Sequence, residues 1–321
     1  MKTYKTWLNR AVTEADLGTT IQLTRPPQQY PIRRMFIRLQ GEFTFGVVGA
    51  VDYVIGIEFV KRFIRRLSFQ LGSANFLKDT PGVSNVILNN LHGPSWGLSG
   101  ETFPGETFTS GDTLTVLTSH VVEFSDPNSI NGDNSALIPS LYPDAQLNIE
   151  LTDFVELTTA GDWDYTFAGR LEVVIEQETS LKVMPNALLK AFTQTTDIVT
   201  TGFLPVDLPT NALISEMLVV PLVDGAPNTD AIDYNAAFQI DIESGQTILD
   251  DRSFVGAQAM GFYDTEANYP LGSLLGGNAF PPPYLYYNLD HYHDGKGMFD
   301  NRQVRKWQLI VPAIYDPLTV N

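Results

Sequence analysis

The stretch Phe69–Asp79, FQLGSANFLKD, has a counterpart in Asp241–Asp251, DIESGQTILDD, and this pair indicates how the chain is organised. Each reads as the end of an alternating strand, a turn that contains Gly and Ser, and a second strand that ends in Asp. The apolar residues around each strand alternate in the same way: Phe63, Leu67, Phe69 and Leu71 in the first copy, and Phe238, Ile240 and Ile242 in the second. A strand–turn–strand unit that occurs twice predicts the tandem duplication of one all-β module.

Two further pairs of segments flank this unit in the same order along the chain. Met35–Gly41 and Met217–Gly225 lie upstream as predicted opening strands, and Arg170–Ile175 and Lys306–Val311 lie downstream as predicted closing strands. The spacings between the pairs differ, so the loops have changed in length while the order of the strands has not. Each copy is therefore expected to close its own β-sandwich.

The hydrophobic pattern in the first half has a period of two, which is typical of strands with one buried face. Arg34–Phe45 and Leu147–Leu157 both alternate apolar and polar residues in this way. Strands of this kind belong to antiparallel sandwiches or barrels. A chain of 321 residues also suits two domains of about 100 to 200 residues each.

Composition excludes several classes of protein and site. The chain has no Cys, which excludes disulfide scaffolds, thiolate zinc sites and a cysteine nucleophile, and which fits a reducing cytoplasm. No signal peptide is expected, because the first residues lack an apolar segment followed by small residues. The most apolar run, Phe43–Ile57, is interrupted by Asp52 and is shorter than the roughly 20 residues of a membrane-spanning helix.

Charge is distributed unevenly along the chain. Residues 1–70 contain 11 Lys and Arg against 5 Asp and Glu, a net charge of +6, whereas the whole chain carries −17. Such asymmetry indicates that the basic part meets an anionic partner. The residues predicted to face a membrane or the interior of an assembly are Lys2, Lys5, Trp7, Arg10, Arg33, Arg34, Arg38, Lys61, Arg62, Arg65 and Arg66. The alternative is ordinary ion pairing with the abundant carboxylates. Sequence-specific nucleic-acid binding is not expected, because exposed aromatic residues do not alternate with these Lys and Arg residues.

The basic start of the chain reads as an arm with a weak amphipathic helical pattern. It is expected to lie on an anionic membrane, under a neighbouring subunit, or simply on its own domain. A second helix is predicted at Pro185–Gln194, inside the connector. The predicted organisation is an N-terminal arm at 1–24, a first β-domain at 25–177, a connector at 178–202, a second β-domain at 203–317 and a tail at 318–321.

Two clusters of residues are candidate sites. His291 and His293 would share one face of a strand, as in metal enzymes of the cupin type, but the downstream carboxylate and the upstream Gly of that pattern are absent. No catalytic residue, metal or cofactor is therefore predicted. Three aromatic residues that follow a run of Pro are predicted to contact a partner subunit or a receptor, or to pack on their own domain: Tyr284, Tyr286 and Tyr287.

The paired strand–turn–strand units and their flanking strands resemble the double jelly-roll major capsid proteins of the adenovirus-hexon lineage. Within it, the chain is most similar to those of tailless bacteriophages with an internal membrane, such as the lipid-containing phage of Flavobacterium. The resemblance implies two tandem eight-stranded jelly rolls with no enzymatic activity. It also implies a homotrimer that tiles an icosahedral virion, contacts neighbouring capsomers and minor capsid proteins, lies over the membrane, and is assembled in the host cytoplasm.

Two other classes of protein fit the same residues. One is a carbohydrate-binding or surface adhesion protein of two β-sandwiches, in which Trp96 and the three tyrosines would stack on sugars. The other is a cupin-like metalloenzyme that uses His291 and His293.

Overall fold

The structure is a computed structural model of the whole chain, and it divides into two compact units, Met1–Thr193 and Gln194–Asn321. Each unit is described by itself. The residues that the structure describes are 2–46, 53–55, 62–72, 75–92, 107–125, 135–160, 164–180, 188–210, 213–214, 216–223, 226–227, 231–233, 236–242, 247–253, 285–288, 299–300, 302 and 305–315.

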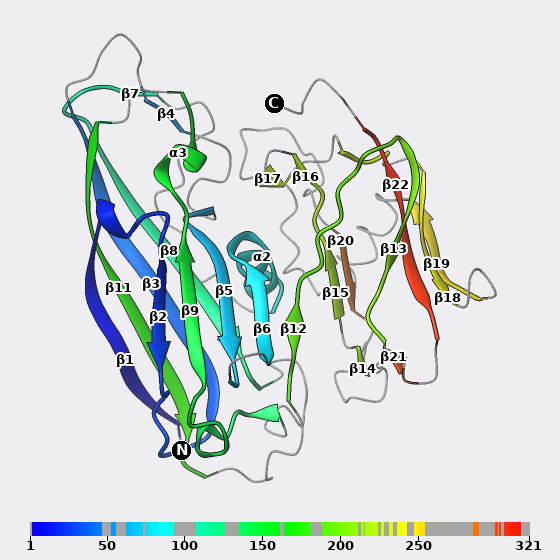
Figure 1. Cartoon of the computed structure of the whole chain (residues 1–321), viewed down its shortest axis with the longest axis horizontal. Coiled ribbons are helices and arrows are strands. Elements are labelled where there is room, and N and C mark those ends of the chain that lie inside the picture. Colours follow the sequence, from blue (N-terminus) through cyan, green and yellow to red (C-terminus); the bar gives the residue numbers. More distant parts are fainter. Residues whose placement is uncertain are drawn as a thin grey trace. The chain divides into compact units, whose positions relative to one another are not determined.

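The first unit is a sandwich of two large sheets (Figure 1). One sheet has the order β1-β11-β3-β8, and the other has the order β12-β6-β5-β9-β2. The strands are β1 (Lys2–Thr13), β2 (Thr20–Thr24), β3 (Ile32–Phe45), β5 (Ile64–Gln70), β6 (Phe76–Pro81), β8 (Thr113–Glu123), β9 (Gln146–Leu151), β11 (Tyr165–Glu178) and β12 (Ala191–Phe192). If β12 is left out, the eight remaining strands can be numbered one to eight along the chain. The first sheet then has the order 1-8-3-6 and the second sheet has the order 2-7-4-5. That is the strand order of a jelly roll.

Smaller elements complete the first unit. A three-stranded sheet contains β10 (Thr158–Ala160), β4 (Tyr53–Ile55) and β7 (Thr107–Phe108). The helical elements are η1 (Glu14–Asp16), α2 (Gly82–His92), η3 (Pro139–Leu141) and α3 (Phe154–Leu157). Helix α2 packs against β5, β6 and β8, and so bridges the two large sheets.

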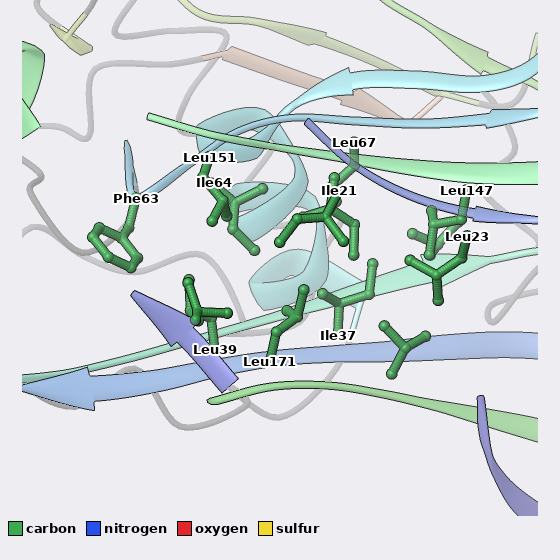
Figure 2. Close-up of a cluster of buried hydrophobic side chains, with 14 of the residues drawn as sticks. Ile21, Leu23, Ile37, Leu39, Phe63, Ile64, Leu67, Leu147, Leu151 and Leu171 are labelled. Atoms are coloured by element: carbon green, nitrogen blue, oxygen red, sulfur yellow. The ribbon is translucent and has the colours of Figure 1, made fainter. Parts of the chain in front are cut away.

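Alternating apolar residues from the two large sheets form one core. Figure 2 shows Ile21, Leu67 and Leu147 of one sheet facing Ile37 and Leu171 of the other. All five are buried, as the period-two pattern requires of residues on the inner face. The alternation predicted for Arg34–Phe45 is thus confirmed by β3, whereas the strand predicted at Leu147–Leu157 ends at Leu151 and is followed by α3.

One end of this core is filled with aromatic rings. The Phe43 ring centroid lies 4.6 Å from that of Phe167 and 5.0 Å from that of Phe154. Gly41 and Gly169 face each other across β3 and β11, and the Phe167 ring lies against both. A Cβ atom added to Gly41 would lie 2.5 Å from the Phe167 ring, so the ring occupies space that side chains at these two positions would fill.

The second unit also contains a four-stranded antiparallel sheet, in the order β13-β22-β18-β19. Its strands are β13 (Gly202–Asp207), β22 (Trp307–Ala313), β18 (Ala237–Ile242) and β19 (Thr247–Ser253). Three antiparallel pairs accompany it: β14 (Leu213–Ile214) with β21 (Phe299–Asp300), β15 (Glu216–Val219) with β20 (Leu285–Asn288), and β16 (Leu222–Val223) with β17 (Ala226–Pro227). Phe238 and Trp307 lie at the centre of its buried core.

The four-stranded sheets of the two units share one plan. In each sheet, the first described strand (β1 or β13) pairs with the closing strand (β11 or β22). The closing strand also pairs with an inner strand (β3 or β18), and a fourth strand (β8 or β19) forms the other edge. The two predicted strand–turn–strand units are confirmed as antiparallel strand pairs, β5 with β6 and β18 with β19. Their predicted alignment with each other is wrong, because β18 pairs with the closing strand β22, whereas β5 and β6 lie in the sheet that lacks the closing strand β11. Alternation shows which residues of a strand are buried, but it does not show which sheet the strand joins.

The two predicted opening segments form strands, β3 in the first unit and β15 and β16 in the second, but they do not open their units. β1 precedes Met35–Gly41 and β13 precedes Met217–Gly225, and each of these earlier strands pairs with the closing strand of its unit. The described part of residues 1–24 is therefore not an amphipathic helix: it forms β1, the short 3₁₀ helix η1 and β2, and both strands lie within the sheets of the first unit. β1 pairs with the edge of β11 and so satisfies the backbone N–H and C=O groups of that edge. A helix at the start of the chain would have left these groups of β11 unpaired.

The predicted connecting helix is wrong over its described part. Residues 188–190 have no regular structure, and β12 pairs in parallel with β6. β12 covers the otherwise open edge of β6, and this tertiary pairing overrides the helix preference of the Ala and Leu residues.

Candidate interaction surfaces

The predicted basic residues include two arginine pairs, and each pair lies at a β-bulge. The register of β3 with β11 skips Arg33, and the register of β5 with β9 skips Arg65. A bulge adds one residue to its strand, so two consecutive side chains can avoid the core. This explains why Arg65, which alternation alone placed in phase with the buried Leu67, is exposed together with Arg66.

Carboxylates of neighbouring strands and of α3 pair with these arginines. Arg66 makes two 2.6 Å hydrogen bonds to Asp79, and Arg65 Nη2 lies 3.1 Å from Glu156 Oε2. At the other bulge the contacts are longer. Arg33 Nη1 lies 3.5 Å from Glu178 Oε2, and Arg34 Nε lies 3.5 Å from both Glu123 Oε2 and Glu176 Oε2.

The remaining predicted basic residues have varied surroundings. Lys2 Nζ lies 3.1 Å from the buried carboxylate of Glu176, Arg10 pairs with Asp16, and Arg62 donates to the Glu156 carbonyl at 2.8 Å. Trp7 is half-buried against the core, and Lys61 lies outside the described residues. Lys5 and Arg38 are exposed, and no ion pair holds either of them within the described part of the chain.

The two arginine pairs do not form one basic plate. Arg33 and Arg34 lie on the four-stranded sheet, and Arg65 and Arg66 on the five-stranded sheet. The outward faces of two packed sheets point away from their common core in opposite directions, so the two arginine pairs do not share one face of the first unit. Contact of individual residues with a membrane or an interior remains a prediction.

For two of the three predicted aromatic residues, the structure favours packing on their own domain over contact with a partner. Tyr286 and Tyr287 belong to β20 and are buried within the second unit, where the Tyr286 hydroxyl donates to Glu216 at 2.8 Å. These two rings are therefore core residues and are not available to a receptor or a sugar. Tyr284, Trp96, His291 and His293 lie outside the described residues. Among those described, no group of three or more His, Cys, Asp or Glu side chains could hold a metal ion.

A buried polar network, which the sequence did not indicate, joins α2 to β8. The Thr118 hydroxyl lies 3.1 Å from His120 Nε2, and His120 Nδ1 lies 3.3 Å from Asn85 Oδ1. Asn85 Nδ2 donates to the Val121 carbonyl at 3.1 Å. The amide oxygen can only accept, so Nδ1 carries the proton and Thr118 donates to Nε2. Desolvation by burial lowers the pKa of His120 from 6.5 to about 3, so the imidazole is neutral in the folded protein.

The burial of neutral His120 predicts loss of stability in acid. The unfolded chain binds a proton at this residue below about pH 6.5 and the folded chain only near pH 3, so stability falls as pH falls through that window. At pH 5 the loss from this residue is about 2 kcal/mol. Urea unfolding of the wild type and of His120→Gln at pH 7 and pH 5 measures it. The pH-dependent loss is expected to be smaller in the variant, and equal losses would contradict the assignment.

No helix in the described part of the chain is long and apolar enough to cross a membrane.

Comparison with known proteins found similarity in structure alone. No family model and no curated protein matches the sequence. The STIV (Sulfolobus Turreted Icosahedral Virus) major capsid protein is 13% identical with a TM-score of 0.71, and the match covers 98% of this chain and 92% of that one. The major capsid protein P2 from bacteriophage PM2 is 9% identical with a TM-score of 0.53, over 98% and 92% of the two chains. The PBCV-1 virus capsid gives 9% identity and a TM-score of 0.57, over 97% and 84%. The chain therefore has the double jelly-roll fold of these viral major capsid proteins.

Proposed function

We propose that this protein is a major capsid protein, a structural subunit of an icosahedral virion. The observation that carries the proposal is the match of nearly the whole chain, across both units, to the major capsid protein of STIV. The matched chains come from three different viruses, and in each the fold belongs to a capsid. In this function the protein contributes surfaces to subunit interfaces, and assembly in the host cytoplasm fits the absence of Cys.

We further propose that the chain assembles as a homotrimer. Three copies of a two-roll chain supply six similar units, and a near-hexagonal base made from six units tiles a shell. The shared sheet order of the two units supports this, because units of the same plan can occupy similar positions in such a ring.

The trimer is tested with the purified full-length chain. Size-exclusion chromatography with light scattering is expected to give a mass three times that of the 35.6 kDa chain. Electron microscopy of the same material, or of native particles, is expected to show hexagonal capsomers or shells. A chain that stays monomeric at every concentration would count against the capsid proposal.

Contact with an internal membrane is a separate part of the proposal, and the net charge of +6 in residues 1–70 supports it. Lys5 and Arg38 are its best test, because they are exposed and have no ion pair among the described residues. Each base near an anionic bilayer contributes about 1 kcal/mol, so the Lys5→Ala/Arg38→Ala variant is expected to bind phosphatidylserine vesicles about 30-fold more weakly. Lys190→Ala, which removes one exposed base elsewhere in the first unit, is the control. Undiminished vesicle binding by the double variant would refute this role for the two residues.

A further inference from the structure

The five-stranded sheet of the first unit has an outward face made largely of uncharged polar side chains. Strands β2, β9, β5 and β6 lie side by side in this order (Figure 1). Ile21, Leu67 and Leu147 point inward from these strands into the core, so the residues that alternate with them point outward. The outward residues of two adjacent rows make up the amide face: Thr24, Gln146, Gln70 and Phe76 in one row, and Gln22, Asn148, Ser68 and Asp79 in the other.

Side-chain amides form a hydrogen-bonded chain across three strands of this face. Gln22 Nε2 donates to Gln146 Oε1 at 2.9 Å, and Gln146 Nε2 donates to Gln70 Oε1 at 2.6 Å. Beside this chain, Asn148 Nδ2 donates to the Ser68 hydroxyl at 3.3 Å. Long polar side chains on a surface lose rotamer entropy when a ligand orders them. The bonds between these side chains already restrict their rotamers, so the amide face is preorganised for a ligand.

The amide chain leaves donors and acceptors unused. A side-chain amide has two N–H donors and an oxygen with two lone pairs, and Gln146 spends one donor and one lone pair on its neighbours. Gln70 Nε2, at the end of the chain, donates to no group within the described part of the molecule. An amide with one free N–H beside one free lone pair matches two hydroxyls on neighbouring carbon atoms, because one hydroxyl accepts while the other donates.

An exposed aromatic ring ends the same row. Phe76 pairs with Gln70 across β6 and β5 and is 44% exposed. It is the one exposed large hydrophobic residue on the described strands β2, β9, β5 and β6, so this face lacks the apolar centre that a protein interface requires. A single ring beside a row of amides instead suits a pyranose sugar. The C–H bonds of such a sugar can lie on the negative face of the ring while its hydroxyls reach the amides.

The charges on this side of the sheet cancel. Arg66 pairs with Asp79, and Arg65 Nε lies 3.6 Å from Glu150 Oε1, so two bases meet two acids. Nucleic acids and acidic polysaccharides bind to surfaces with an excess of Lys and Arg, which is absent from these described residues. The balance favours an uncharged ligand.

We propose that the amide face binds an uncharged saccharide chain of a host cell surface. Phe76 stacks on one pyranose ring, and Gln70 and Gln146 form hydrogen bonds with the hydroxyls of that ring and of the next. Saccharide binding by the chain does not depend on the proposed capsid function. The use of this binding, to hold a particle on a host cell, does rest on it.

The test titrates the full-length chain with three neutral hexasaccharides, cellohexaose, mannohexaose and xylohexaose, and follows binding by saturation-transfer NMR. Their β-linked chains are extended, as a ligand that lies on a sheet must be. At least one is expected to bind with a Kd of about 1 mM or less, which is typical of a shallow exposed site. Phe76→Ala and Gln146→Ala are each expected to weaken binding about 10-fold, whereas Phe76→Tyr, which keeps the ring, stays within about twofold of the wild type.

Two matched controls lie on the other large sheet of the first unit. Gln40→Ala removes an exposed amide and Tyr4→Ala removes a ring that is 63% exposed, and both are expected to leave binding unchanged. Circular dichroism checks that each variant is folded, and Gln70→Ala replaces Gln146→Ala if that variant is not.

The proposal is overturned if none of the three hexasaccharides binds, or if the folded Phe76 and Gln146 variants bind as the wild type does. Tighter binding of polygalacturonate than of the neutral chains would overturn the assignment of an uncharged ligand. A trimer that binds no saccharide overturns this site and leaves the capsid proposal intact. A chain that is monomeric at every concentration but shows the expected losses in the variants supports the site and counts against the capsid function.

Discussion

Gly82→Ala is expected to destabilise the first unit by at least about 3 kcal/mol. Gly82 begins α2, and a Cβ atom there would lie 1.7 Å from the carbonyl oxygen of Ile64 on β5. Main-chain atoms cannot rotate away as a side chain can, so α2 would have to separate from β5. That shift would also strain the Asn85–His120 network, because His120 Cε1 lies 3.4 Å from the same Cβ position.

The measurement is urea and thermal unfolding followed by circular dichroism. For a unit of this size, about 3 kcal/mol corresponds to a fall of roughly 10 °C in Tm. Ser84→Ala, two residues further along α2 and half-buried, is the matched control and is expected to stay within about 0.5 kcal/mol of the wild type. A Gly82→Ala protein as stable as this control would show that α2 does not approach β5 so closely.

Gly41→Ala is expected to cost about 2 to 3 kcal/mol. The new methyl group would lie 2.5 Å from the Phe167 ring and 2.8 Å from the Cα atom of Gly169. The ring cannot easily move, because Phe43 packs against it at 4.6 Å. Denaturant unfolding of the variant measures the loss of stability.

A double-mutant cycle shows whether the Phe167 ring is the cause. Phe167→Leu removes part of the ring, so the double variant with Gly41→Ala is expected to lose at least about 1 kcal/mol less than the sum of the single losses. Ala168→Val enlarges an exposed residue on the same strand, facing outward, and is expected to be nearly neutral. Simple additivity of the two single changes would mean that the ring does not fill the space above the glycines.

The candidate surfaces were only partly predictable from the sequence. The excess of basic residues in the first 70 positions is visible in the sequence, but ion pairing by Arg33, Arg34 and Arg65 depends on carboxylates far along the chain.

The local pattern of the sequence was enough to predict the all-β class and the inner face of strands such as β3. These properties follow from a local period of two, which fixes the side on which each residue lies. The tertiary structure was needed to show that β1 and β13 pair with the closing strands, that β5 lies in a sheet without the closing strand whereas β18 pairs with one, and that residues 191–192 form a strand. Strand pairing joins backbone groups that are distant in sequence. A sheet edge accepts whichever segment best satisfies its open hydrogen bonds, and no local pattern records that choice.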